Sequence, residues 1–496
     1  MNPGSTNRRF SSSPRRQGKI LVLMMILVPV FCGIAGLIID GGLLMLESRH
    51  AQNVADAAAT AAATELRLGN GTAAAISAAE TEVQTSNGMT DAIVTVHVPP
   101  QTGPYAGVSN YVEVRIEQSV NTHLIHVLSG RQTETAAARA VAGVEDATDN
   151  AAVIVLDPDP SPFSTDPVPL AVPLNLPSIM GGLEVLGLGN ARVQNAVIVN
   201  TRWGGVDENN EPAGEGAGPP YGVSCMPLLP TTKFYASDLR VAGGVDDPTN
   251  YRNVQAGQPS PLQANRLPVP DPLKTLPVPT LAADAVNVKA TNYGGKSIVA
   301  LPLFPVTLNP GVYDYITVVT GTVVFNPGVY IIRGIDPETQ HALQLAAGKV
   351  QANGVMFYIT NTASYSPATG SPDASDGETE PASSGSGTLL SSAVINLGLL
   401  GSSFSPLNSP NSPFDGMMIY QRRQDRRAII LVQENLIAGG TLQGTVYAKW
   451  GHVILAGRGE YTARFAAGTM RLIALLDMSI NPSNPFPPAR DVFLVE

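Results

Sequence analysis

The sequence predicts one transmembrane helix, then a small α+β module, then an all-β region folded as a right-handed parallel β-helix-like solenoid. Three observations predict this architecture. Residues 20–39 carry no charged or strongly polar side chain, residues 40–148 combine an alanine-rich helix with alternating apolar segments, and a glycine-tyrosine motif repeats after residue 300. The 48 glycines and 41 prolines among 496 residues favour short strands between many turns.

The apolar stretch 20–39 is long enough to cross a bilayer as a helix, at about 1.5 Å of rise per residue. A proline inside lipid is tolerated and usually produces a kink. The membrane-spanning positions that define the stretch are its two ends, its proline and two of its small residues: Ile20, Pro29, Gly33, Gly36 and Ile39. A cleaved secretory signal is the alternative, but its apolar core is usually shorter. We therefore expect an uncleaved anchor.

The charges before the anchor predict its orientation. Five basic residues precede the apolar stretch, and no acidic residue occurs before Asp40. The positive-inside rule makes residues 1–19 a cytoplasmic basic tail and places the chain after Asp40 outside. The net charge of −10 argues against nucleic acid as a partner. Cys32 and Cys225 are not expected to form a disulfide, because Cys32 lies in the membrane.

Residues 40–148 are predicted to form a stalk helix and a small α+β domain. Small apolar residues recur on the helix at steps of three and four, and we call them the alanine ridge: Ala51, Val54, Ala55, Ala58, Ala62 and Leu66. A smooth ridge lets a helix or sheet approach closely, either from the chain's own domain or from a neighbouring subunit. Alternating apolar segments at 92–98, 111–117 and 135–144 predict strands.

The β-rich region contains an internal repeat. Leu308-Asn-Pro-Gly-Val-Tyr313 recurs 17 residues later as Phe325-Asn-Pro-Gly-Val-Tyr330. No single rung buries its own apolar face, so rungs are expected to stack over residues 281–360 and 414–476. The other stretches are predicted to be less regular: an irregular Pro/Gly-rich region at 149–280 with the solenoid beginning near 180, a disordered Ser/Gly/Pro insertion at 361–413, and a tail at 477–496.

Three N-terminal segments carry a resemblance to a known family. Arg16-Gln-Gly18, the end of the apolar run at 33–40, and Gln52-Asn-Val-Ala-Asp-Ala-Ala-Ala59 resemble the N-terminal module of TadG-type proteins of the tight-adherence (Flp) pilus assembly system. The resemblance implies a bacterial inner membrane anchor with the bulk of the chain in the periplasm or otherwise extracytoplasmic. It also implies a pilin-like domain at 40–148, and other pilus-assembly or minor-pilin-like proteins as partners of the stalk helix.

The repeats resemble the glycine-rich C-terminal portions of some TadG-related proteins, whereas other members carry a von Willebrand A domain, from which this chain departs. The metal-binding loop of that domain needs Asp-x-Ser-x-Ser after a buried strand, and here the strand leads into Asp157-Pro-Asp159-Pro-Ser161. We interpret Asp157 and Asp159 as a strand-end turn, with a cation site as the alternative. The acidic loop from Asp207 to Glu211 leaves the same choice between solvated loop and calcium site.

Other motifs are incomplete, so we expect neither a cofactor nor a metal. Ala290-Thr-Asn-Tyr-Gly-Gly-Lys-Ser297 lacks the first glycine and the following helix of a phosphate-binding loop. His123 and His126 have no third ligand in view. One basic cluster between apolar strands is a candidate ligand patch, either an exposed turn or a contact for cell-wall or surface glycan: Arg422, Arg423, Arg426 and Arg427.

These observations predict a non-enzymatic, envelope-anchored component of tight-adherence pilus assembly or surface attachment, acting as a scaffold or an adhesive rod. Two alternatives remain open. One is a surface adhesin that binds glycan or matrix independently of pili. The other is a membrane-tethered β-helix enzyme that acts on carbohydrate, since such enzymes use carboxylates and basic residues on an exposed groove.

Overall fold

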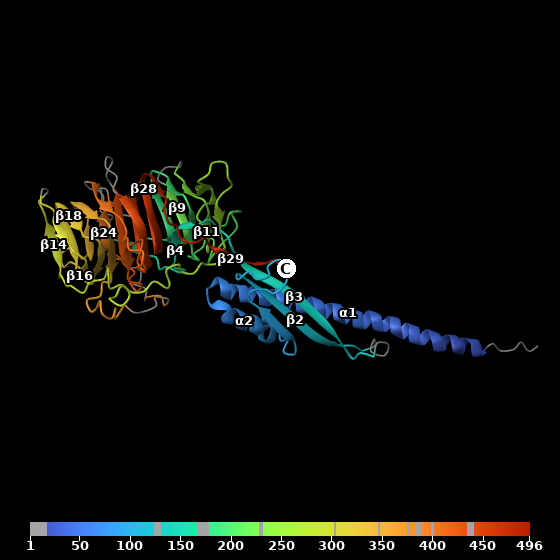
Figure 1. Ribbon diagram of the computed structural model, residues 1–496. Helices are drawn as coiled ribbons and strands as arrows, with labels where there is room; N and C mark the ends of the chain where they lie inside the picture. The colour runs from blue at the N-terminus through green and yellow to red at the C-terminus, as the bar shows by residue number, and fades with distance from the viewer. Residues whose placement is uncertain are drawn as a thin grey trace, which may run out of the picture. The chain divides into compact units, whose positions relative to one another are not determined.

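The computed structural model describes most of the chain: residues 17–123, 130–165, 178–227, 232–301, 304–345, 348–373, 377, 379, 381, 388–389, 391–397, 401–433 and 441–496. The predicted basic tail lies almost wholly outside these residues. The chain forms two compact units, which we call the N-terminal unit (residues 1–145 and 491–496) and the β unit (residues 146–490) (Figure 1). A long apolar helix followed by a mostly β chain with a parallel sheet is confirmed.

The described residues of the N-terminal unit form two α-helices, a short π-helix and four strands. In chain order these are α1 (Gln17–Arg67), α2 (Gly71–Thr81), the π-helix Glu82–Ser86, β1 (Ile93–His97), β2 (Tyr111–Asn121), β3 (Thr133–Asp146) and β29 (Arg490–Leu494). α1 runs without interruption through Pro29, from the apolar stretch into the alanine-rich segment. Alanine, the strongest helix former, sustains the second half of this helix.

The sheet of this unit has the order β1-β2-β3-β29. β1 pairs antiparallel with β2, and β2 pairs antiparallel with β3 over eleven residues. The last strand of the chain lies beside β3, where the Val141 amide donates to the Glu496 carbonyl at 2.8 Å and the Val495 amide donates to the Val141 carbonyl at 2.9 Å. The whole β unit is therefore inserted between two adjacent strands of the N-terminal unit.

The β unit begins with nine strands that join its main sheet, together with β5 (Ser164–Thr165), which pairs with β23 (Thr388–Leu389). The nine are β4 (Ala151–Val155), β6 (Gly181–Gly187), β7 (Ala191–Val193), β8 (Ala196–Val199), β9 (Tyr221–Pro227), β10 (Phe234–Ala236), β11 (Leu239–Val241), β12 (Tyr251–Asn253) and β13 (Leu262–Gln263). A short 3-10 helix, Pro248–Asn250, precedes β12.

The second half of the β unit supplies fourteen more strands of the same sheet. They are β14 (Lys296–Val299), β15 (Val306–Leu308), β16 (Gly311–Tyr313), β17 (Ile316–Thr320), β18 (Thr322–Phe325), β19 (Gly328–Ile332), β20 (Leu343–Leu345), β21 (Lys349–Ala352), β22 (Val355–Ile359), β24 (Ser391–Asn396), β25 (Ser403–Phe404), β26 (Met417–Gln421), β27 (Ala428–Gln433) and the long segment β28 (Thr441–Ile480).

Each strand of this sheet from β14 to β25 pairs in parallel with the strand that comes three or four places later in the chain. β14 pairs with β17, β17 with β20, β20 with β24, and β24 with β27. The series β15, β18, β21, β25 and the series β16, β19, β22, β26 follow the same rule. β28 joins the two halves of the unit, because it pairs with β25, β26 and β27 of its own half and with β4, β6 and β7 of the first half.

The two copies of the 17-residue repeat place equivalent residues opposite each other on paired parallel strands. Leu308 of β15 lies opposite Phe325 of β18. The side-chain amide of Asn326 donates to the side-chain carbonyl of Asn309 at 2.8 Å. The repeated tyrosines stack, with ring centroids of Tyr313 and Tyr330 separated by 5.8 Å. Tyrosines of β22, β26 and β28 form a second contact series, since Tyr358 contacts Tyr420 and Tyr420 contacts Tyr447, with centroids 4.9 and 5.3 Å apart.

A segment without long strands, residues 264–295, connects the first half of the β unit to the second. We call it the strap. Its apolar residues pack against a buried cluster on the sheet that includes Val329, Tyr358 and Tyr420: Val269, Leu273, Leu276, Val278, Leu281 and Ala283. The strap connects β13, which pairs with β11, to β14, which pairs with β17. Figure 1 shows β11 and β14 in different parts of the β unit.

The structure differs from the sequence prediction in three stretches. Residues 149–280 contain the nine strands of the first half and begin the sheet at Ala151, well before residue 180. The described part of 361–413 is not a disordered insertion, because β24 is buried along its whole length and pairs with β20 and β27. Residues 477–496 are not a free tail, because they include the end of β28 and the whole of β29.

Candidate functional site

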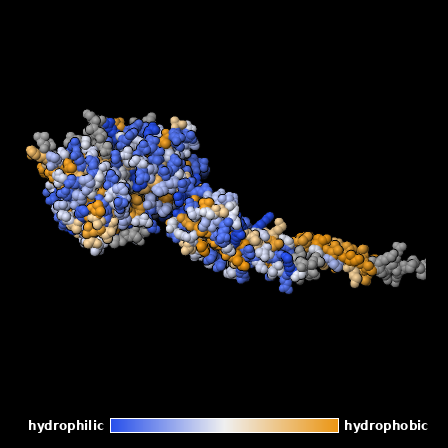
Figure 2. Space-filling view, in the orientation of Figure 1, coloured by the Kyte–Doolittle hydropathy of each residue, from blue (hydrophilic) through white to orange (hydrophobic). Residues whose placement is uncertain are grey.

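The anchor is the exposed apolar half of α1. Its large apolar side chains face outward, with Met25 74% exposed and Leu37 63% exposed. Figure 2 shows this part of the helix as an almost continuous apolar surface. The helix is long and apolar enough to cross a membrane. The side chain of Asp40, which ends the apolar stretch, is buried and accepts a hydrogen bond from the His123 amide at 3.1 Å. This hydrogen bond joins Asp40, at the polar end of the anchor, to the residues that directly follow β2.

The alanine ridge lies in the core of the N-terminal unit. Ala51, Ala55, Ala58 and Ala62 are fully buried, Val54 is 2% exposed, and Leu66 is half-buried beside them. They pack against α2 and the inner faces of β2 and β3, including Val112, Val114, Ala138 and Ala140. The ridge is therefore not a free docking face for a neighbouring subunit. The small side chains are needed because the helix lies close against the chain's own sheet.

The opposite side of α1 remains accessible. Asn53 and Thr60, which are seven residues apart and therefore lie on the same side of the helix, are exposed. Gln52 and Asp56 lie between the two sides, where the Gln52 amide donates to Asp56 at 2.7 Å and to the Arg139 carbonyl of β3 at 3.1 Å. The polar residues of the motif that begins at Gln52 therefore fix the helix against β3, while the accessible surface is limited to the outer side.

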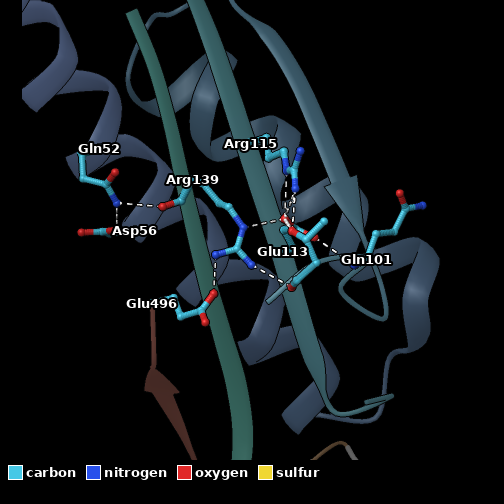
Figure 3. A network of polar contacts seen from close by, with 8 residues as sticks. Gln52, Asp56, Gln101, Glu113, Arg115, Arg139 and Glu496 are labelled. Carbon is cyan, nitrogen blue, oxygen red and sulfur yellow. Dashed lines mark hydrogen bonds and ion pairs between the residues drawn. The ribbon is translucent and has the colours of Figure 1, made fainter. Parts of the chain in front are cut away.

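A buried carboxylate organises the other face of the sheet. The side chain of Glu113 in β2 is fully buried, and it accepts hydrogen bonds from the Gln101 amide at 2.9 Å, the Thr102 hydroxyl at 2.8 Å, and the guanidinium groups of Arg115 at 2.8 Å and Arg139 at 2.6 Å. Figure 3 shows these donors converging on one carboxylate. Arg139 also forms an ion pair with Glu496, the last residue of the printed sequence.

The network fixes the charge state of Glu113. Burial raises the pKa of this carboxyl, but hydrogen bonds from Arg139, Gln101, Thr102 and Arg115 outweigh burial and hold the pKa well below 4.5. Three of the four donors bind Oε1 and the Gln101 amide binds Oε2, and the carboxylate is fully buried, so a substrate has no access to it. We therefore assign the network a structural role, which is to join β2, β3 and the C-terminal strand.

Acidification is expected to destabilise the N-terminal unit through Glu113. Its pKa is lower in the folded than in the unfolded chain, so its stabilisation is complete above pH 4.5 and is lost as the pH falls below that value. We expect the melting temperature of this unit to fall between about pH 5 and about pH 2, and Glu113→Gln to reduce that fall. Unfolding followed by circular dichroism across this range tests the prediction. An unchanged pH profile in the variant would contradict it.

Removal of the last strand is expected to loosen β3. Deleting residues 491–496 eliminates three backbone hydrogen bonds to Val141 and the Glu496 partner of Arg139, at an expected cost of about 2–3 kcal/mol. Hydrogen exchange of the β3 amides should then be faster. Glu496→Gln is the matched control, since it keeps the strand and should cost less than about 1 kcal/mol. Equal protection of β3 in the deleted chain and the intact chain would show that β29 contributes nothing.

The arginine cluster is not an open ligand patch. Arg423 is 6% exposed, and its guanidinium donates to the Tyr447 hydroxyl at 2.9 Å and to the strap carbonyls of Leu273, Lys274 and Leu276 at 2.8 to 3.1 Å. The guanidinium carbon also lies 5.8 Å from the ring centroid of Tyr420. Arg423 therefore holds the strap to the sheet.

The other three arginines each have a carboxylate partner. Arg422 pairs with Asp373 at 2.7 Å, Arg426 with Asp157 at 3.5 Å, and Arg427 with Asp425 at 3.2 Å. Burial raises the pKa of Asp373 to about 6, against the attraction of Arg422. The sequence prediction of a ligand patch missed these pairings because the partners lie as far as 269 residues away, as Asp157 does from Arg426.

The two candidate cation loops also make internal contacts. Asp157 is 1% exposed and accepts from the Asp159 amide at 3.1 Å, while Asp159 accepts from the Trp203 indole at 3.2 Å. Asp207 accepts from the amides of Asn209 and Glu211 at 2.8 and 2.9 Å. Among the described residues, no group of three or more His, Cys, Asp or Glu side chains is arranged to hold a metal ion. His126 lies outside the described residues.

The remaining candidates are distributed over separate elements. Residues 290–297 run from the strap into β14, and no helix follows them. Cys225 is buried in β9, and burial raises the pKa of its thiol to about 12. Cys225 and Cys32 are both free. The structure brings none of these residues together with the arginine cluster.

Comparison with known proteins bears on the anchor and the ridge. Residues 18–65 match the model of the family described as Flp pilus-assembly TadE/G-like. No curated protein and no solved structure matches the chain. The matched residues are the anchor and the alanine-rich half of α1, which the structure joins in one continuous helix. The chain therefore carries an N-terminal TadE/G-like module of the Flp pilus-assembly family.

Proposed function

We propose that this protein is a non-enzymatic, membrane-anchored component of tight-adherence pilus assembly, with the β unit held outside the cytoplasmic membrane as a scaffold or adhesive rod. The observation that carries the proposal is the TadE/G-like match over residues 18–65. One support is the anchor, whose preceding basic residues favour a cytoplasmic N-terminus. The other is the packing of α1 on an antiparallel sheet, which supports the pilin-like domain that the resemblance implies.

The β unit suits a rigid spacer if it is a right-handed β-solenoid. Parallel pairing of each strand with one about three strands later is the connectivity of such a coil, and parallel crossovers are almost always right-handed. Stacked tyrosines and one continuous buried cluster from Ala152 to Ile480 would make neighbouring turns depend on one another. A rod of this kind needs no catalytic residue to act as a spacer.

A complementation experiment tests the proposal. The gene is deleted from its native host, and piliation and surface attachment are measured by electron microscopy and adhesion assay. The intact chain is expected to restore both. A chain in which residues 1–39 are replaced by a cleavable secretion signal is expected to restore neither, although both units are exported. Normal piliation in the deletion strain, or full rescue by the unanchored chain, would contradict the proposal.

A further inference from the structure

A small cavity lies on the β unit between β28 and the chain segment that follows it. Its volume is about 120 Å³. The cavity is lined by two glycines, two prolines and six polar residues: Gly416, Gly444, Pro406, Pro482, Gln443, Thr445, Thr462, Arg464, Ser483 and Asn484. None of these residues belongs to the arginine cluster or to the Glu113 network. Nothing described above gives the cavity a role.

Among the described residues that line this cavity, Arg464 is the one with a charged side chain. Its guanidinium donates to the Thr445 hydroxyl at 2.8 Å and to the Pro485 carbonyl at 3.3 Å, and it lies over the Phe486 ring, 4.4 Å from the centroid. All these partners are neutral. Burial lowers the pKa of the guanidinium, which is the effect of a positive charge removed from water without an anion beside it.

Arg423 also donates to neutral oxygen atoms, but it has four such acceptors, whereas Arg464 has two. Three other arginines have a carboxylate partner. Arg139 pairs with Glu113, Arg422 with Asp373, and Arg471 with Glu184. Among the residues that the structure describes, Arg464 forms no ion pair. A partly buried cation without an anion is costly unless a ligand supplies the charge. The cavity therefore has the electrostatic character of a site for one negative charge.

The neutral side chains around Arg464 restrict the class of anion. Hydroxyl and amide groups donate and accept hydrogen bonds, as the hydroxyl groups of a sugar do. A phosphate usually binds several backbone amides or several cationic side chains, and this cavity offers one cation. We propose that the cavity binds an acidic sugar residue, with Arg464 holding its carboxylate and the Thr, Ser, Asn and Gln side chains contacting its hydroxyl groups.

The site gives the β unit a specific way to contact an acidic glycan, and it is independent of whether the chain serves pilus assembly. It also replaces the arginine cluster as the candidate glycan contact. The guanidinium is suited to this role because it presents two parallel donors to a carboxylate, and the packing against Phe486 and the bonds to Thr445 and Pro485 fix its orientation.

The binding test uses the full chain in detergent micelles, with glucuronate and galacturonate as probes in ligand-observed NMR. We expect at least one of them to bind with a Kd of about 1 mM, as for a single sugar with few contacts. Glucose lacks the carboxylate and acetate lacks the ring, so both are expected to bind at least about tenfold more weakly. Arg464→Gln should abolish uronate binding. Arg192→Gln, which alters an arginine over Tyr235 outside the cavity, should leave it unchanged.

A second measurement needs no variant. Phenylglyoxal modifies arginine side chains, and mass spectrometry locates the modified positions. A bound uronate is expected to protect Arg464 and to leave the modification of Arg192 unchanged. The proposal is overturned if neither uronate binds, if Arg464→Gln binds as tightly as the unchanged chain, or if Arg464 is modified equally with and without uronate. Equal affinity for acetate or inorganic phosphate and for uronates would also overturn it, because the site would then recognise only charge.

Discussion

Replacing Ala58 by glutamate is expected to unfold the N-terminal unit and leave the β unit folded. Ala58 is fully buried between α1 and the sheet, where the small side chain allows close packing. A glutamate there brings a longer side chain and a carboxylate into an apolar core without a partner, at a cost of about 5 kcal/mol or more. Hydrogen exchange should become fast in β1, β2 and β3 and remain slow in strands such as β19 and β22.

Thr60→Glu is the matched control for this change. Thr60 lies two residues further along the same helix and is exposed, so the same charge should alter stability by less than about 0.5 kcal/mol. Slow exchange throughout the N-terminal unit of the Ala58→Glu chain would show that the ridge does not lie in the core. Fast exchange in both units would show that the two do not unfold separately.

Replacing Arg423 by alanine is expected to release the strap from the sheet. The change leaves the carbonyls of Leu273, Lys274 and Leu276 without their donor and removes the cation beside Tyr447. Three orphaned acceptors in a mostly buried position give an expected cost of about 3–5 kcal/mol to the β unit. Faster hydrogen exchange and new proteolytic cleavage within residues 264–295 would measure it.

Two further variants, Arg423→Lys and Arg202→Ala, show whether the destabilisation comes from the lost guanidinium geometry, from the lost charge, or from the loss of any arginine. Lysine keeps the charge but lacks the planar fork that reaches several carbonyls, so most of the destabilisation should remain. Arg202 is 52% exposed in a surface ion pair with Glu215, and its loss should cost less than about 1 kcal/mol. Full stability in Arg423→Lys would mean that charge alone, and not the geometry of the guanidinium, holds the strap.

The insertion of the β unit constrains how the chain folds. Arg139 and Glu496 are 357 residues apart in sequence, yet they form one ion pair. Bringing such distant segments together costs loop-closure entropy, which grows slowly with length. Synthesis delivers β29 last, so the sheet of the N-terminal unit stays incomplete until the β unit has been made. An early N-terminal unit therefore has three strands, with the edge of β3 open.

The features that sequence reasoning predicted well are local. The anchor follows from an uninterrupted apolar run, and the ridge from a period that marks one face of a helix. The 17-residue repeat was visible because each copy keeps the same Asn-Pro-Gly-Val-Tyr order, and its copies do lie on neighbouring strands. In these cases the pattern that identifies the element is contained in the element itself.

The features that it missed depend on distant residues. Strands such as β10 and β13 have two or three residues, too few for any period to appear, and become strands only by pairing with β7, β11 and β12. A basic run such as 422–427 looks like a surface patch until its partners are known. A ridge of alanines also does not say which surface covers it, and the structure supplies the chain's own sheet.

The most direct test of the account is site-specific photo-crosslinking from the exposed side of α1 in cells that make pili. A photoreactive residue at Thr60 is expected to capture other pilus-assembly or minor-pilin-like proteins, identified by mass spectrometry. The same residue at buried Ala58 is expected to react only within its own chain, with residues of β2 or β3. Capture of no such protein from Thr60 in piliated cells, or of the same partner from both positions, would contradict the account.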